Sequence, residues 1–205
     1  MSMRVMRLCW YLNVIGRLRG LLMNAVAEKF EQFEWLTKGI TAKSPQFGDE
    51  GHSTGVKPLD YQDRLGAIAS METQLEKSVT SLIIYGEHAK SDYEYIRNHL
   101  AKIMMNGAVE DKKREPEHIA IYHLSWLIAR MVIDFSINPE LEGNFTPQGR
   151  LYYAGIKLFQ MPVNAYRQTW KQYENLMVIA LETSIKCASE AVEKYRKETH
   201  KEVKN

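Results

Sequence analysis

Cysteine is scarce in this chain of 205 residues, and the two that occur, Cys9 and Cys187, lie far apart. Structural zinc sites need several thiolate or imidazole ligands at short spacing, usually including a CxxC-like pair. The sequence has no such pair, which excludes a zinc ribbon or a zinc finger. Two isolated cysteines are typical of a reducing compartment, where thiols remain free.

The common nucleotide-phosphate and zinc-hydrolase motifs are also missing. The sequence contains no GxxxxGK[ST] or GxGxxG phosphate loop and no HExxH zinc site. His118 and His123 are five residues apart, so they do not share a helix face as residues four apart would. We therefore predict that the protein is not an enzyme and that it holds neither a cofactor nor a metal.

Apolar runs long enough to cross a bilayer are absent as well. The apolar stretch near the start is short, is interrupted by Asn13, and precedes Arg17 and Arg19, which is not the order of a signal peptide. A helix lying on a membrane surface is the alternative for this stretch. Because Met23 resembles a natural start, we interpret residues 1–22 as a non-native or flexible extension. Without it no targeting signal remains, and we expect a cytoplasmic protein without membrane contact.

Strict alternation of apolar and polar residues is too brief anywhere to indicate a strand. Apolar residues recur instead at steps of three and four, which predicts an all-α fold, a bundle of about five or six helices. We expect an N-terminal helix and a Gly- and Pro-rich linker in residues 23–59, followed by one helical domain in residues 60–205. Within that domain the predicted helices cover about 65–86, 91–107, 116–137, 146–156 and 162–198, with a loop at 139–145.

Charge is unevenly distributed, although the formal net charge is only +2. Residues 1–22 contain four arginines and no acidic residue, and residues 150–205 contain ten Lys or Arg against six Glu, a local net charge of +4. A local basic surface attracts phosphate even on a nearly neutral molecule. The C-terminal part is therefore the first place to look for a nucleic-acid contact.

Residues 146–175 predict a helix-turn-helix-like unit. Thr146-Pro147 is typical of a helix start, Gly155 of a helix end, and a second helix follows Pro162. In such units the second helix enters the major groove of DNA with its first turns at the base edges. The sequence therefore predicts contact with double-stranded DNA.

The second helix has two faces of different character. One face is apolar or aromatic and is expected to pack inward: Val163, Tyr166, Trp170, Tyr173 and Met177. The other carries side chains that can pair with bases or bind phosphate. The candidate DNA-binding residues are those of this face and two flanking phosphate contacts: Asn164, Arg167, Gln168 and Lys171, with Arg150 and Lys157. The alternative interpretation is the ordinary polar face of an amphipathic helix.

The C-terminal third resembles a known family. The segments Arg130–Phe135, Gly149–Ile156, Tyr166–Trp170 and Tyr173–Leu176 are similar to those of phage-encoded helical regulators, nearest the Q-type transcription antitermination proteins of tailed phages. Many of those proteins carry a cysteine-rich zinc element, which this chain lacks. The resemblance implies a phage-encoded transcription regulator that binds DNA and joins the host RNA polymerase.

A second function class remains open. The tail of the last helix carries an apolar stripe that includes Ile185, Ala188 and Val192. Such a stripe either closes the protein's own core or pairs with a partner. A helical protein–protein interaction module, such as a phage-encoded inhibitor or adaptor without DNA binding, is therefore the alternative function. Neither interpretation predicts the oligomeric state.

Overall fold

The computed structural model describes residues 30–37 and 61–202 of the chain. All regular structure in these two ranges is helical and none is strand, which confirms the predicted all-α class. After a helical segment at residues 30–37, the elements are α2 (Tyr61–Ala69), α3 (Gln74–Tyr85), η1 (Gly86–His88), α4 (Lys90–Glu110), α5 (Ile121–Ile137), α6 (Pro139–Glu142), α7 (Pro147–Ala154), α8 (Val163–Ala165), η2 (Tyr166–Trp170) and α9 (Lys171–Glu202).

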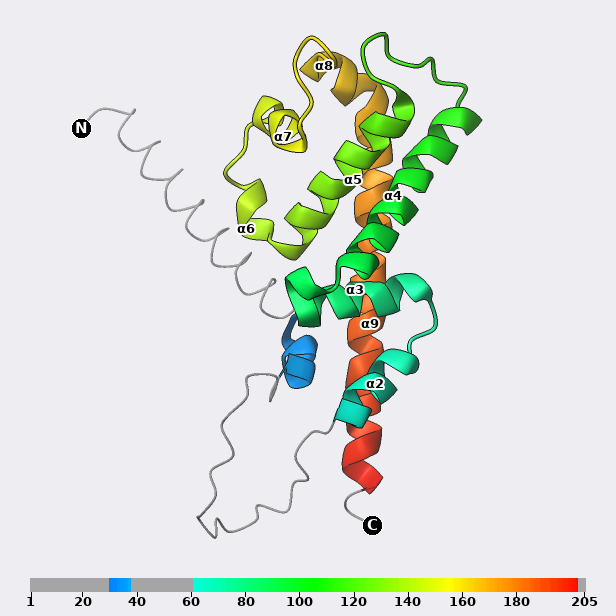
Figure 1. Ribbon diagram of the computed structural model, residues 1–205, viewed down its shortest axis with the longest axis vertical. Helices are drawn as coiled ribbons and strands as arrows, with labels where there is room; N and C mark the ends of the chain where they lie inside the picture. The colour runs from blue at the N-terminus through cyan, green and yellow to red at the C-terminus, as the bar shows by residue number, and fades with distance from the viewer. Residues whose placement is uncertain (1–29, 38–60, 203–205) are drawn as a thin grey trace, which may run out of the picture.

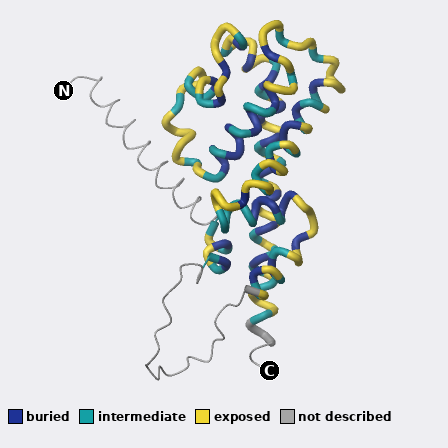
Figure 2. Tube along the Cα trace, in the orientation of Figure 1, coloured by how far each residue is buried: buried dark blue, intermediate teal, exposed yellow. Residues whose placement is uncertain are grey.

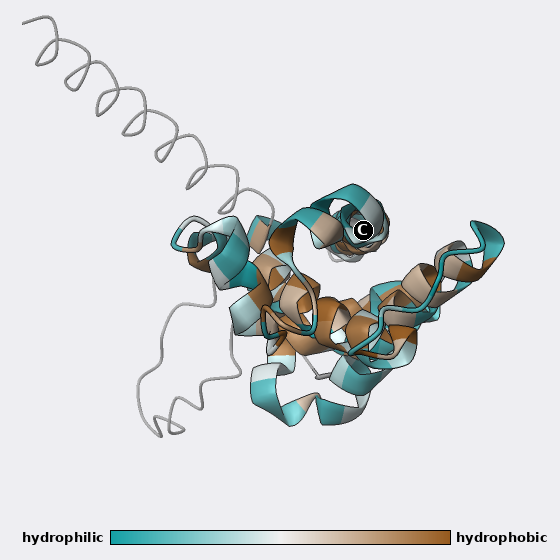
Figure 3. Cartoon of the chain, turned by 90° about the horizontal axis from the view of Figure 1, so that it is seen from above, coloured by the Kyte–Doolittle hydropathy of each residue, from teal (hydrophilic) through white to brown (hydrophobic). Residues whose placement is uncertain are grey.

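Helix α9 organises the bundle, because it runs along the whole length of the described domain (Figure 1). Helices α4 and α5 pack against each other and against the first half of α9, while α2 and α3 pack on its second half. The buried residues lie where these helices face one another (Figure 2), and the same inner faces are the most hydrophobic (Figure 3).

Helix α5 is the most apolar helix of the described domain and contributes to the centre of its core. Leu124, Ile128 and Met131 are completely buried along it, at the three- and four-residue spacing that the sequence shows. Each fully buried side chain of this size stabilises the fold by about 1.5–3 kcal/mol. The prediction of a central apolar helix is therefore confirmed.

The predicted N-terminal helix is described only in part. Residues 30–37 are helical and bury Phe33 and Leu36, as the spacing predicts, and the Trp35 ring lies 6.4 Å from the Tyr195 ring on α9. The predictions for residues 1–22 and for the linker, residues 39–59, lie outside the described residues.

The prediction of a single long helix from about residue 65 to 86 is wrong. This part of the chain forms two helices, α2 and α3, and Met71 is buried between them. Thr73 caps α3 by accepting from the Glu76 amide at 3.2 Å, and the Glu76 carboxylate accepts from the Thr73 amide at 3.3 Å. This reciprocal capping box satisfies two free amides and begins a new helix within a continuous apolar pattern.

The predicted limits of α4 are also wrong at both ends. The helix begins at Lys90 without a side-chain cap, and Asp92 in its first turn accepts from the Ser81 hydroxyl on α3 at 2.7 Å. At the other end it continues through Gly107 to Glu110. Gly107 therefore lies within the helix, and the space that a side chain would need there is filled by the ring of Tyr173.

Two further boundaries differ from the prediction. Helix α5 begins at Ile121 rather than near Pro116, and the Glu115 carboxylate accepts from the Ile121 amide at 3.0 Å. Residues 139–142, predicted as part of a loop, form the short helix α6.

Among the described residues, no helix is both long and apolar enough to cross a membrane.

Candidate nucleic-acid interface

Helix α7 begins and ends where the sequence predicts. The Thr146 hydroxyl accepts from the Gly149 amide at 3.1 Å, and Pro147 occupies the first turn, where no amide donor is needed. At the other end Gly155 has a φ of 91°, the left-handed conformation that glycine adopts without strain. The cap turns the chain sharply into the connector that follows.

The connector spans residues 156–162 and is anchored at both ends by apolar side chains. Ile156 and Met161 are buried, whereas Lys157 and Phe159 between them are exposed. The Gln160 side chain accepts from the Lys157 amide at 3.0 Å and closes the turn. Lys157, a predicted phosphate contact, is exposed on this turn, with its Nζ 5.9 Å from the centre of the Phe159 ring.

The second helix is continuous but is not a regular α-helix throughout. Helix α8 passes through the π-helical turn η2 into α9, and the Lys171 amide donates to the Tyr166 carbonyl, five residues earlier. A π turn is uncommon and often occurs at functional sites. It widens the helix by one residue and places both Tyr166 and Trp170 inward, where they are about 4% and 3% exposed.

The two predicted faces of this helix are present. Tyr166, Trp170, Tyr173 and Met177 are buried, and Val163 is partly buried. Asn164, Arg167 and Gln168 are exposed on the first turns. Three of the predicted DNA-binding side chains are thus gathered on one accessible surface, directly after the connector.

Arg150 and Lys171 are engaged in a different way from the prediction. Both bind the carboxylate of Glu174, which is only 1% exposed: Arg150 Nη2 lies 2.5 Å and Lys171 Nζ 2.6 Å from Oε1. Arg150 also pairs with the exposed Glu142. Arg150 therefore ties α7 to the start of α9 through a buried carboxylate, while Lys171 pairs with the same carboxylate within α9.

Tyr166 completes this network, because its hydroxyl donates to Glu174 Oε2 at 2.7 Å. Burial raises the pKa of the Tyr166 phenol well above its ordinary value, and the negative charge of Glu174 and the hydrogen bond to it act in the same direction, opposed by Arg150. The phenol consequently remains a donor. Both oxygens of the buried carboxylate are satisfied, as a buried charge requires.

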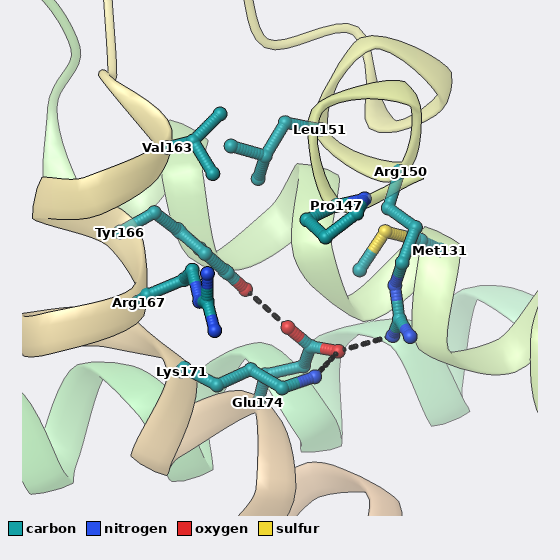
Figure 4. Close-up of a pocket in the computed structure, with 9 residues that line it drawn as sticks. All are labelled: Met131, Pro147, Arg150, Leu151, Val163, Tyr166, Arg167, Lys171 and Glu174. Carbon is teal, nitrogen blue, oxygen red and sulfur yellow. Dashed lines mark hydrogen bonds and ion pairs between the residues drawn. The ribbon is translucent and has the colours of Figure 1, made fainter. Parts of the chain in front are cut away.

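A cavity of about 440 Å³ lies between α7 and the second helix. Figure 4 shows Glu174 at its base, Val163 and Leu151 facing each other across it, and Arg167 beside Tyr166 and Lys171. The walls are mainly apolar, and the polar groups converge at one end. Within the described residues Arg167 forms no hydrogen bond or ion pair, in contrast to Arg150 and Lys171.

The loop between α4 and α5 adds basic residues to the same end of the molecule (Figure 1). Asp111 accepts from the Tyr173 hydroxyl at 2.5 Å, and the His118 ring lies 6.4 Å from the Phe159 ring on the connector. Between these two anchors the loop carries the exposed Lys112 and Arg114. These residues were not among the predicted phosphate contacts, although the run Lys112-Lys113-Arg114 is visible in the sequence.

Glu174 was also missed, because a single glutamate on an amphipathic helix resembles any solvated charge. Its position one helical turn after Lys171 is the only local signal, and the partnership with Arg150 spans 24 residues.

Residues 51–55, Gly-His-Ser-Thr-Gly, match the GxSxG pattern of serine hydrolases but lie outside the described residues. That pattern acts at a strand-to-helix turn, and no strand occurs in the described ranges.

Comparison with known proteins gives no further guide to function. No family model, no curated protein and no solved structure matches this chain.

Proposed function

We propose that this protein binds double-stranded DNA as a transcription regulator, with the first turns of the α8–η2 helix at the base edges. The observation that carries the proposal is the shared exposure of Asn164, Arg167 and Gln168 on a helix whose opposite face is buried. Arginine pairs with guanine, and asparagine or glutamine with adenine, through two hydrogen bonds each. This set of side chains has the chemistry of base recognition.

Phosphate contacts come from the residues around that helix. Lys157 on the connector and Lys112 and Arg114 on the neighbouring loop are exposed at the same end of the domain. Cations in such positions orient a protein on the duplex without reading its sequence. In this proposal Arg150 and Lys171 do not contact DNA directly: both neutralise Glu174, and Arg150 in doing so holds α7 against the second helix.

The resemblance to Q-type antitermination proteins makes the proposal more specific. A regulator of that type would bind DNA near a phage promoter and act on the RNA polymerase of the host. The corresponding experiment is to add the purified protein to transcription by bacterial RNA polymerase across a terminator, with and without the selected DNA site upstream. Read-through that requires both the protein and the site is the expected result.

The primary experiment measures binding to labelled duplex DNA by fluorescence anisotropy across a salt series, first on random sequence and then on sites selected from it. Neutralising several phosphates makes affinity fall steeply with salt. Arg167→Ala should weaken binding to a selected site by about 1–3 kcal/mol. The matched control is Arg196→Ala, which removes one exposed arginine from the distant end of α9.

Two results would argue against DNA binding. One is the absence of measurable affinity even at the lowest salt concentration. The other is an equal affinity for the Arg167→Ala and Arg196→Ala variants, on random and selected sequences alike, which would leave the exposed helix face without a role.

A second candidate function is a protein–protein interaction module. The observation that favours it is a hollow of about 490 Å³ on the outer face of α7, bordered by Tyr152 and Leu158. Tyr152 is 78% and Leu158 53% exposed, and Phe159 on the same connector is 66% exposed. Large exposed apolar groups of this kind mark binding surfaces. Loss of RNA polymerase binding in a Tyr152→Ser/Leu158→Ser variant that still binds DNA would assign this surface to a protein partner.

A further inference from the structure

The cavity between α7 and the second helix has the size and lining of a small-molecule site. Its volume of about 440 Å³ lies within the range of ligand pockets, about 300–1,000 Å³. Met131, Leu151, Val163 and Pro147 form an apolar wall. The hollow is open to solvent on one side, where Pro147 and Arg167 are exposed, so a ligand can enter it.

The charges around the cavity decide what kind of ligand fits it. At its base Glu174 and the adjoining Glu142 balance Arg150 and Lys171, so this network is already neutral. Glu174 Oε1 accepts from two cations and Oε2 from the Tyr166 hydroxyl, so the charge of this carboxylate is already compensated and a cationic ligand would be repelled by Arg150, Lys171 and Arg167. Arg167 is the uncompensated charge at the cavity, and it forms no ion pair within the described residues.

Lys171 contributes a second donor on the same side. Its side chain is 37% exposed, and only one of its ammonium protons is used by Glu174. A carboxylate placed between Arg167 and Lys171 would find charge-assisted donors on two sides, while the apolar wall would contact the remainder of the molecule. A free inorganic anion would bind the charged donors but would make no apolar contact with the wall.

We infer that this cavity binds a small organic anion, a monocarboxylate with a compact apolar body, with its carboxylate at Arg167 and Lys171 and its body against Pro147, Leu151 and Val163. The inference goes beyond DNA binding and stands without it. If the proposed function also holds, the ligand occupies Arg167 and withdraws it from DNA, so the carboxylate acts as an effector that lowers DNA affinity.

The test uses benzoate as the probe, with benzyl alcohol as its uncharged counterpart and inorganic phosphate as an anion without an apolar body. Binding is followed by nuclear magnetic resonance of the full chain labelled at its methionine methyl groups, because Met131 lines the cavity. We expect benzoate to shift the Met131 methyl signal in a saturable manner, and to bind at least tenfold more tightly than benzyl alcohol or phosphate.

The matched variants are Arg167→Gln and Arg196→Gln, two exposed arginines, of which only the first lines the cavity. Arg167→Gln should weaken benzoate binding at least tenfold, and Arg196→Gln should leave it unchanged. Equal affinity of the two variants, or benzoate binding no tighter than benzyl alcohol, would overturn the inference. Retention of benzoate binding by a protein that fails to bind DNA would separate this site from the proposed function.

Discussion

Arg150 on α7 and Glu174 on α9 form an ion pair with 2.5 Å between Nη2 and Oε1, although they are separated by 24 residues in the chain. The pair joins the short helix before the connector to the long helix after it. Glu174 is almost completely buried, whereas the second carboxylate bound by Arg150, that of Glu142, is 49% exposed. The same arginine thus makes one buried and one exposed ion pair, and the two should differ greatly in their contribution to stability.

Removing the buried carboxylate should destabilise the fold strongly. Glu174→Ala leaves Arg150 and Lys171 without their shared partner and removes the acceptor of the Tyr166 hydroxyl. Breaking a buried pair by removing one partner costs about 3–5 kcal/mol. We expect a loss of this size in the free energy of unfolding measured with urea. Glu142→Ala is the control and should cost about 1 kcal/mol or less, because its pair is exposed; equal losses would show that burial of Glu174 is not important.

Close packing between α4 and α9 should make Gly107 sensitive to substitution. A Cβ atom at this position would lie 2.9 Å from Cδ1 and Cε1 of the buried Tyr173 ring. Overpacking costs about 1–3 kcal/mol, and the better helix propensity of alanine returns at most about 1 kcal/mol. We therefore expect Gly107→Ala to lower the unfolding midpoint in urea by an amount equivalent to about 1 kcal/mol.

Gly143→Ala is the matched control for that substitution, since the nearest atom to its added Cβ would be 4.0 Å away. It should leave the midpoint nearly unchanged. A Gly107→Ala variant as stable as the wild type would mean that the Tyr173 ring moves aside without cost.

Asp134 on α5 should make stability depend on pH. Burial raises the pKa of this carboxyl group, and the hydrogen bond from the Tyr153 hydroxyl at 2.9 Å and the charge of Arg130 oppose the shift only in part. Because the folded-state pKa lies above the unfolded value, the folded protein binds the proton more tightly. Stability is therefore complete below the unfolded pKa, near 3.8, and falls as pH rises through the folded pKa.

Asp134→Asn removes this titration while keeping a hydrogen-bond acceptor for Tyr153. The variant should gain stability relative to the wild type as pH rises from about 4 toward neutrality, as measured by urea unfolding at several pH values. Asp92→Asn, at a partly buried aspartate on α4, serves as the comparison. A stability difference between the Asp134→Asn variant and the wild type that does not change with pH would contradict the prediction.

Lys157 should contribute to DNA affinity without contributing to sequence preference. It is exposed on the connector, where it has the position of a phosphate contact. Lys157→Ala should weaken binding to all duplexes by a similar factor and reduce the slope of log affinity against log salt by about 1. Lys186→Ala, which removes a 77% exposed lysine from the middle of α9, should leave the slope unchanged. A change in the preferred sequence on Lys157 substitution would instead assign it a base contact.

Much of the local architecture follows from the sequence alone. The spacing of Leu124, Ile128 and Met131 determines which face of α5 is buried, because residues three and four apart lie on one side of a helix. Thr146, Pro147 and Gly155 determine the limits of α7, because each satisfies a backbone requirement at the position it occupies. The exposed set of Asn164, Arg167 and Gln168 could also be predicted from helical periodicity.

Only the tertiary structure shows where α4 ends and which polar side chains are engaged within the fold, because helical periodicity predicts neither. The sequence predicts that a helix ends at Gly107, yet α4 continues through this residue. The ring of Tyr173 on α9 fills the space that a side chain at this position would occupy. The sequence predicts a phosphate contact for Arg150 and a place on the DNA-binding helix face for Lys171, yet both bind Glu174, because a buried carboxylate must have its charge compensated by the cations that the fold brings near. Local patterns determine where helices begin and which faces they bury, whereas contacts between residues distant in the chain determine which polar side chains remain free to bind a partner.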